Sequence, residues 1–155
     1  LSARLAERGL VFPMRYLPSW VREGGVVIDV HPPRRDWPLP TDATPLPAFH
    51  VTLIGRKVFL EQQDEMAKVW EEVRPILPLP PQAELDATVN QAVNEDRMTW
   101  FLHIANQDEF RSYVQELTSI LDDAFTRLIG CGFTNPETDR HFRMSVANNQ
   151  GGDPL

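Results

Sequence analysis

Two short segments in opposite halves of the chain alternate apolar and polar residues. Residues 49–54 read Phe-His-Val-Thr-Leu-Ile, and residues 142–147 read Phe-Arg-Met-Ser-Val-Ala. Successive side chains of a β-strand point to opposite faces, so each segment predicts a strand with one apolar and one polar face. His50 and Thr52 share the polar face of the first strand. The arginine and the serine of the second segment share a face in the same way.

Other segments show the periods of helices and strands. The β-branched run at residues 26–30 predicts a strand. Apolar residues at helical spacing predict amphipathic helices at residues 64–77 and from near residue 108 to Gly130 or Gly132. Residues 85–93 and 98–105 read as two strands of a hairpin, joined by the polar turn Asn-Glu-Asp. Both predicted helices then have an apolar face that can cover a sheet.

The order strand, helix, hairpin, helix and strand predicts an α+β fold. We expect a single domain over residues 1–155, with approximate lobes at 1–80 and 81–155. The lobes meet at residues 77–81, whose sequence Leu-Pro-Leu-Pro-Pro is typical of a linker. Each lobe is expected to hold an antiparallel sheet with flanking helices, and the two motif strands to face each other across a central cleft. A short helix is also predicted at residues 2–9.

Composition and charge narrow the class of protein. The chain of 155 residues is 42% hydrophobic and 24% charged, which is ordinary for a globular domain. No stretch approaches the ~20 apolar residues of a membrane span. A net charge of −7 argues against a broad grip on duplex DNA, although one positive pocket would suffice for a nucleotide or an RNA end. The single cysteine, Cys131, excludes an internal disulfide framework, so a reducing cytoplasmic setting is expected.

The paired segments resemble the motifs of the 2H phosphoesterase superfamily, whose members carry two His-x-Thr/Ser sequences, each followed by an apolar residue. His50, Thr52 and Ser145 match three of the four signature positions, and Arg143 stands where the family has its second histidine. Residues 145–152, Ser-Val-Ala-Asn-Asn-Gln-Gly-Gly, also resemble the second motif leading into a polar turn. The resemblance implies a duplicated bilobal fold with one motif on a central strand of each lobe.

The same resemblance implies a phosphodiesterase that uses no metal and no cofactor. Its substrates would be 2',3'-cyclic, 2'-5' or cyclic-oligonucleotide phosphodiesters, with one histidine acting as base and the other as acid. RNA-end processing and degradation of a cyclic-nucleotide signal both fit this activity. The expected partner is therefore a nucleotide or an RNA terminus that carries a phosphodiester, and neither a membrane nor duplex DNA.

The residue types suit this chemistry, with one exception. An imidazole titrates near pH ~6.5, so one ring can be neutral while another is charged near neutral pH. Thr52 and Ser145 can donate hydrogen bonds to the non-bridging phosphate oxygens. Arg143 stays protonated, so it can clamp a phosphate but cannot act as acid or base. Since loss of one acid or base costs about 10² to 10⁴ in rate, we expect binding with weak turnover and a gain from Arg143→His.

Neighbouring residues are candidates for substrate binding. His141 shares the face of Arg143 but lies ~6.6 Å along a regular strand, so it is expected beside the site as a substitute acid. The proline-dense stretch at residues 32–47 predicts an extended loop, whose Arg34, Arg35 and Trp37 are candidates for a lid over the ligand.

Other interpretations of the same residues stay open. His50 could be a hydrogen-bonded core histidine, and the second motif could be the exposed face of a half-buried strand. His31 and His103 are expected to have structural roles. A catalytically inactive nucleotide-binding or regulatory protein of the same fold is the main alternative function. A third possibility is an interaction module in which the proline-rich loop and exposed aromatic residues meet a protein partner.

Overall fold

The computed structural model describes residues 10–12, 19–20, 25–32 and 36–150. The helix predicted at residues 2–9 lies outside these residues, and so do Arg34 and Arg35. Within the described part, nine strands are present: β1 (Leu10–Phe12), β2 (Ser19–Trp20), β3 (Val26–Val30), β4 (Thr44–Pro45), β5 (Phe49–Ile54), β6 (Ala83–Leu85), β7 (Asn90–Asn94), β8 (Arg97–His103) and β9 (Arg143–Asn148). The helices are α2 (Gln63–Val73) and α3 (Gln107–Leu128), with 3-10 turns η1 (Arg56–Val58) and η2 (Arg74–Ile76).

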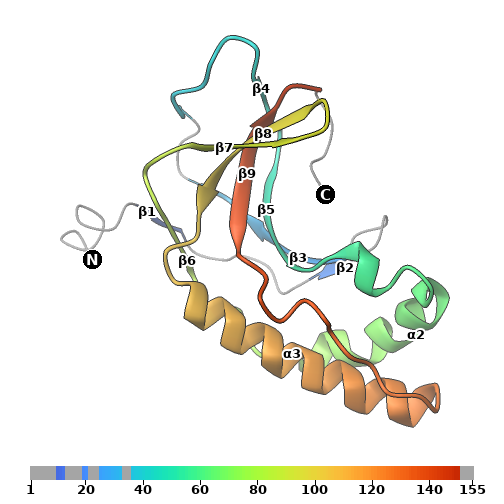
Figure 1. The fold of residues 1–155 in the computed structure, drawn as a ribbon. Coiled ribbons are helices and arrows are strands. Elements are labelled where there is room, and N and C mark those ends of the chain that lie inside the picture. Colours follow the sequence, from blue (N-terminus) through green and yellow to red (C-terminus); the bar gives the residue numbers. More distant parts are fainter. Residues whose placement is uncertain (1–9, 13–18, 21–24, 33–35, 151–155) are drawn as a thin grey trace.

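Most strands form one antiparallel sheet. Its order is β2-β3-β5-β9-β8-β7, and β4 pairs with the far end of β9. The strand β9 runs through the middle of this sheet, between β5 and β8, and α3 runs below it (Figure 1). Among the described residues, a second sheet consists of β1 and β6. The described part therefore has the predicted α+β class.

The two motif strands are direct neighbours. Val51 on β5 pairs with Met144 on β9 in an antiparallel ladder. The prediction that these strands face each other across a cleft, each in a sheet of its own, is therefore wrong for this structure. Each strand has an apolar face suited to the same core, and that shared core favours pairing side by side.

Both long helices bury one stripe. In α3 the buried positions include Phe110, Val114, Leu117 and Leu121, whose spacing of three to four residues places them on one side of the helix. In α2 the same pattern is formed by Met66, Val69, Trp70 and Val73. Together with apolar residues of β3, β5, β8 and β9, these stripes make one continuous core cluster. One face of the sheet is consequently covered by helices.

The opposite face differs in composition. Along β5, the core-facing residues Phe49, Val51 and Leu53 are buried, whereas His50 and Thr52 are only partly buried. Along β9, Met144 and Val146 are buried, while Arg143 is exposed and Ser145 is partly buried. The alternation read from the sequence is thus confirmed in both strands, and we call the second side the polar face.

Two predicted elements differ in extent. The helix expected at residues 64–77 ends at Val73 and continues as the turn η2, since Pro75 lacks a backbone N–H for a helical hydrogen bond. The strand expected at residues 85–93 is divided into β6 and β7. A turn separates them, in which the Asn90 side chain donates to the Thr88 carbonyl at 3.1 Å.

Candidate active site

The strand register gathers the polar residues of four strands on the polar face. Asp29 on β3 pairs with His50, and Val27 pairs with Thr52. Because Val51 pairs with Met144, antiparallel geometry brings His50 toward Ser145 and Thr52 toward Arg143. On the other side of β9, Phe101 and His103 of β8 pair with Ser145 and Arg143. Two adjacent rows result: Asp29, His50, Ser145 and Phe101, and Val27, Thr52, Arg143 and His103.

All four predicted motif residues therefore lie together. Directly opposed residues of antiparallel strands have Cβ atoms only about 4.5–5.5 Å apart, which is within reach of one small ligand. The pairing of β8 with β9 is irregular between Trp100 and Phe101, so the regular register stops at the Phe101–Ser145 pair. Such bulges re-aim side chains and are over-represented beside functional sites.

A second histidine pair closes one end of the site. His103 Nδ1 and His141 Nε2 are 2.6 Å apart, and the two rings meet edge to face with centroids 4.6 Å apart. This hydrogen bond needs a proton on one nitrogen and a free lone pair on the other, so at least one ring is neutral. His141 thus contacts a residue of the polar face. His103, for which the sequence predicted a structural role, stands opposite Arg143.

The environment of His141 favours the neutral ring. Burial lowers its pKa, and the positive fields of His103, Arg111 and Arg143 lower it further, whereas Asp86 acts in the opposite direction. A neutral imidazole is a proton acceptor, so His141 has the character of a general base.

Arg143 is held as a cation at the centre of the second row. Its Cζ atom lies 4.5 Å from the centroid of the Phe101 ring, a cation–π contact. Burial and the neighbouring Arg140 lower its pKa, but a guanidinium remains protonated at any working pH. The aromatic ring and the strand fix where the positive charge stands, which suits a phosphate clamp.

The start of β9 is fixed by the side chain of Gln107. Its Oε1 accepts from Phe142 N at 2.8 Å, and its Nε2 donates to Phe142 O at 2.7 Å. The same Nε2 also donates to Ile104 O at 2.6 Å. Since Phe142 stands between His141 and Arg143, this amide at the first turn of α3 positions both site residues.

In the described part of the proline-rich loop, Trp37 packs at the edge of the core. The Trp37 ring packs edge-on against Phe49, with centroids 6.4 Å apart, and belongs to the partly buried residues around the core. Phe49 points away from the polar face, and the lid role predicted for Trp37 stays a prediction. The predictions for Arg34 and Arg35 concern residues outside the described part.

Two residues of the polar face were not predicted as site residues from the sequence. Asp29 and His103 lie in strands that were predicted, but the face on which each points depends on the strand that pairs with it. For His103, the sequence Trp-Phe-Leu before it gives no alternation from which to read a polar face. A useful signal would have been the partly polar run Asp29 to His31 at the end of an otherwise β-branched strand.

The described residues contain no cluster of three or more His, Cys, Asp or Glu side chains that could hold a metal ion. Within the same residues, no helix is long and apolar enough to span a membrane. Comparison of the chain with protein-family models, with curated proteins and with solved structures found no match. The residues of the polar face are therefore the features that bear on function.

Proposed function

We propose that the polar face binds the phosphate of a nucleotide or RNA terminus and cleaves a phosphodiester bond by imidazole acid–base chemistry. The observation that carries this proposal is the meeting of His50, Thr52, Arg143 and Ser145 on adjacent strands, beside the His103–His141 pair. Membership of the 2H phosphoesterase superfamily and a cytoplasmic location are parts of the same proposal.

The phosphate would lie between β5 and β8, over β9. These two strands are two spacings apart, or about 10 Å, which leaves room for a phosphate between side chains that lean inward. Arg143 then binds two non-bridging oxygens from the β9 side, and the hydroxyls of Thr52 and Ser145 donate to the same oxygens. The charge of Arg143 supports this role, because it stands at the centre of the polar face in a chain of net charge −7.

The reaction needs two proton transfers. For a 2',3'-cyclic phosphate, neutral His141 takes a proton from water as the water oxygen bonds to phosphorus. The bond from phosphorus to one ribose oxygen breaks, and that oxygen receives a proton from charged His50. Asp29 lies opposite His50 in the ladder. His141 thus supplies the second imidazole that the motif itself lacks.

A binding protein without turnover is the second candidate function. Arg143 favours it, because the position where the family has a catalytic histidine holds a group that cannot exchange its proton. This candidate predicts affinity for nucleotides without product.

Product analysis separates the two candidates. We would incubate the wild-type protein and Arg143→His with a chelator and a panel of 2',3'-cyclic nucleotides, 2'-5' linked dinucleotides and cyclic dinucleotides, and identify products by mass. The wild-type protein is expected to cleave at least one member, and His141→Gln to lower that rate by about 10² or more. Cleavage by Arg143→His alone would show that the wild-type chain is the inactive form. Cleavage by neither variant would remove the enzymatic proposal.

A further inference from the structure

A short proline-rich segment connects η2 to β6 (Figure 1). Residues 77–82 read Leu-Pro-Leu-Pro-Pro-Gln and lie in no helix or strand, and we call them the Pro-Leu segment. Leu79 is 83% exposed, more than any other large hydrophobic side chain of the described part, and Ile76, just before the segment, is 66% exposed. Apolar side chains grouped on one exposed surface, rather than scattered singly, mark interaction sites.

The prolines hold the Pro-Leu segment in the polyproline II conformation. Pro78, Pro80 and Pro81 each fix their own φ at about −65° and exclude the α region for the residue before them. Leu77 has φ −69° and ψ 138°, close to the polyproline II values of about −75° and 145°. The segment therefore has this shape before any partner binds, which lowers the entropy cost of binding.

Burial along the chain follows the polyproline II repeat of about three residues per turn. Leu77 and Ala83 are buried and Pro80 is partly buried, so this row of side chains faces the core. Leu79 and Gln82 belong to another row and are exposed. One side of the segment is thus attached to the protein, and the side that carries Leu79 is open to a partner.

A buried tyrosine of α3 fixes the Pro-Leu segment in place. The Tyr113 hydroxyl donates to Pro78 O at 2.6 Å. Burial and the neighbouring Glu116 raise the pKa of Tyr113 to about 12, so the hydroxyl keeps its proton at neutral pH. The exposed leucine therefore stands on a segment that is bonded to the helix beside it.

An open acidic hollow of about 490 Å³ lies between the Pro-Leu segment and α3. Leu79 and Pro81 form its apolar wall. The helix supplies Asp108, Glu109, Ser112, Tyr113 and Glu116. No lysine or arginine of the described part lines this hollow. A partner that covers the exposed leucine meets three carboxylates at once, and charge complementarity requires cations on that partner.

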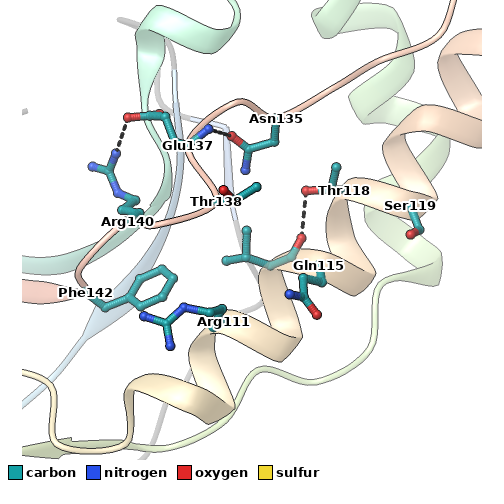
Figure 2. A pocket seen from close by; sticks show the side chains of 10 residues that line it. Arg111, Gln115, Thr118, Ser119, Asn135, Glu137, Thr138, Arg140 and Phe142 are labelled. Carbon is teal, nitrogen blue, oxygen red and sulfur yellow. Dashed lines mark hydrogen bonds and ion pairs between the residues drawn. The ribbon is translucent and has the colours of Figure 1, made fainter.

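The cavity on another side of α3 differs in kind. It measures about 270 Å³ and lies between α3 and the chain that leads into β9. Its polar groups bond to one another: Glu137 pairs with Arg140 at 3.0 Å, and Asn135 Oδ1 accepts from Glu137 N at 3.0 Å (Figure 2). Its apolar wall residues, Val114 and Phe142, are buried. An exposed apolar anchor is present only at the acidic hollow, as far as the linings of these two hollows go.

We propose that the Pro-Leu segment and the acidic hollow dock a protein domain whose aromatic-lined groove binds polyproline II helices and has lysine or arginine at its rim. Aromatic grooves of SH3, WW and EVH1 domains accept a preformed polyproline II segment in this way. Leu79 would enter the groove, and the rim cations would reach Glu109 and Glu116. The proposal is independent of the proposed function, because none of these residues belongs to the polar face.

NMR titration of isotopically labelled domains with the whole protein tests this surface. The probes are purified SH3, WW and EVH1 domains with lysine or arginine at the rim of the groove. At least one is expected to show saturating shifts confined to its groove. Leu79→Ser should weaken that binding by about tenfold or more. The control Val93→Ser changes another exposed aliphatic side chain, 64% exposed on β7, and should leave the affinity unchanged.

A double variant, Glu109→Gln with Glu116→Gln, tests the charges. Both side chains are exposed, so the protein should fold as before, and its melting temperature checks this. Binding of the same domain should weaken severalfold at low salt and lose most of its dependence on salt, because rim charges act through a screened field.

Three results would overturn the proposal. The first is an absence of groove shifts in every domain of the panel, and the second is a folded Leu79→Ser that binds as tightly as the wild-type protein. The third is full affinity and unchanged salt dependence in the double glutamate variant. Sedimentation of the protein alone tests another occupant: a dimer that Leu79→Ser dissociates would assign the segment to a second copy of this chain and overturn the proposal as well.

Discussion

Replacement of His50 by Gln is expected to lower kcat/KM for the cleaved phosphodiester by about 10² to 10⁴, because the leaving ribose oxygen loses its proton donor. Gln is uncharged and does not titrate near neutral pH, but it retains an amide donor of similar reach. The loss should therefore fall mainly on kcat, with KM changed by a small factor. Steady-state rates at several substrate concentrations measure both quantities.

The matched control for this prediction is nucleotide affinity. If His50→Gln binds the substrate as the wild-type protein does, the loss of rate is a loss of chemistry. His50 is partly buried in β5, so the melting temperature of the variant must also be close to that of the wild-type protein. A folded His50→Gln that turns over at the wild-type rate would exclude His50 as acid or base.

Truncation of Phe133 to Ala is expected to lower the free energy of unfolding by about 3–5 kcal/mol. The ring is 3% exposed and stacks between Phe59, at a centroid distance of 5.2 Å, and Phe125, at 5.3 Å. Its backbone N–H donates to Asp122 Oδ1 at 2.7 Å. This aromatic stack holds the chain after α3 against the core before it turns toward β9, so its loss leaves a cavity between three elements.

Urea unfolding followed by fluorescence measures this loss. Phe133→Leu is the matched control, since it keeps an apolar side chain in the stack and should cost clearly less than Phe133→Ala. An Ala variant less than about 1 kcal/mol below the wild-type protein would show that residue 133 is not packed as described.

Local pattern predicted the elements of this fold better than their arrangement. The alternation at residues 49–54 and 142–147 gave two strands with the correct buried faces, because a side-chain period of two depends only on the strand itself. The stripe of α3 gave a helix for the same kind of local reason. Pairing of β5 with β9 joins residues almost a hundred positions apart, and nothing in either strand specifies that partner over another.

In the candidate site, too, local pattern predicted which residues matter but not which of them meet through strand pairing. His50, Thr52, Arg143 and Ser145 came from the motif, and their shared face in the structure follows from strand alternation together with the register. The contact of His141 with His103 could not be predicted, since it depends on β8 lying beside β9. The packing of Trp37 on Phe49 was likewise hidden, because a loop residue has no periodicity that indicates its face.

The central claim is that His50 and the His103–His141 pair flank one phosphate, and proton–nitrogen correlation NMR of the imidazole rings tests it directly. The protein would be titrated with nucleoside 2',3'-cyclic phosphates in the presence of a chelator, after the ring signals are assigned with His→Gln variants. We expect the signals of His50 and His141 to shift together along one saturating curve. Titrations in which neither ring responds, or in which only one does, would contradict a phosphate site between them.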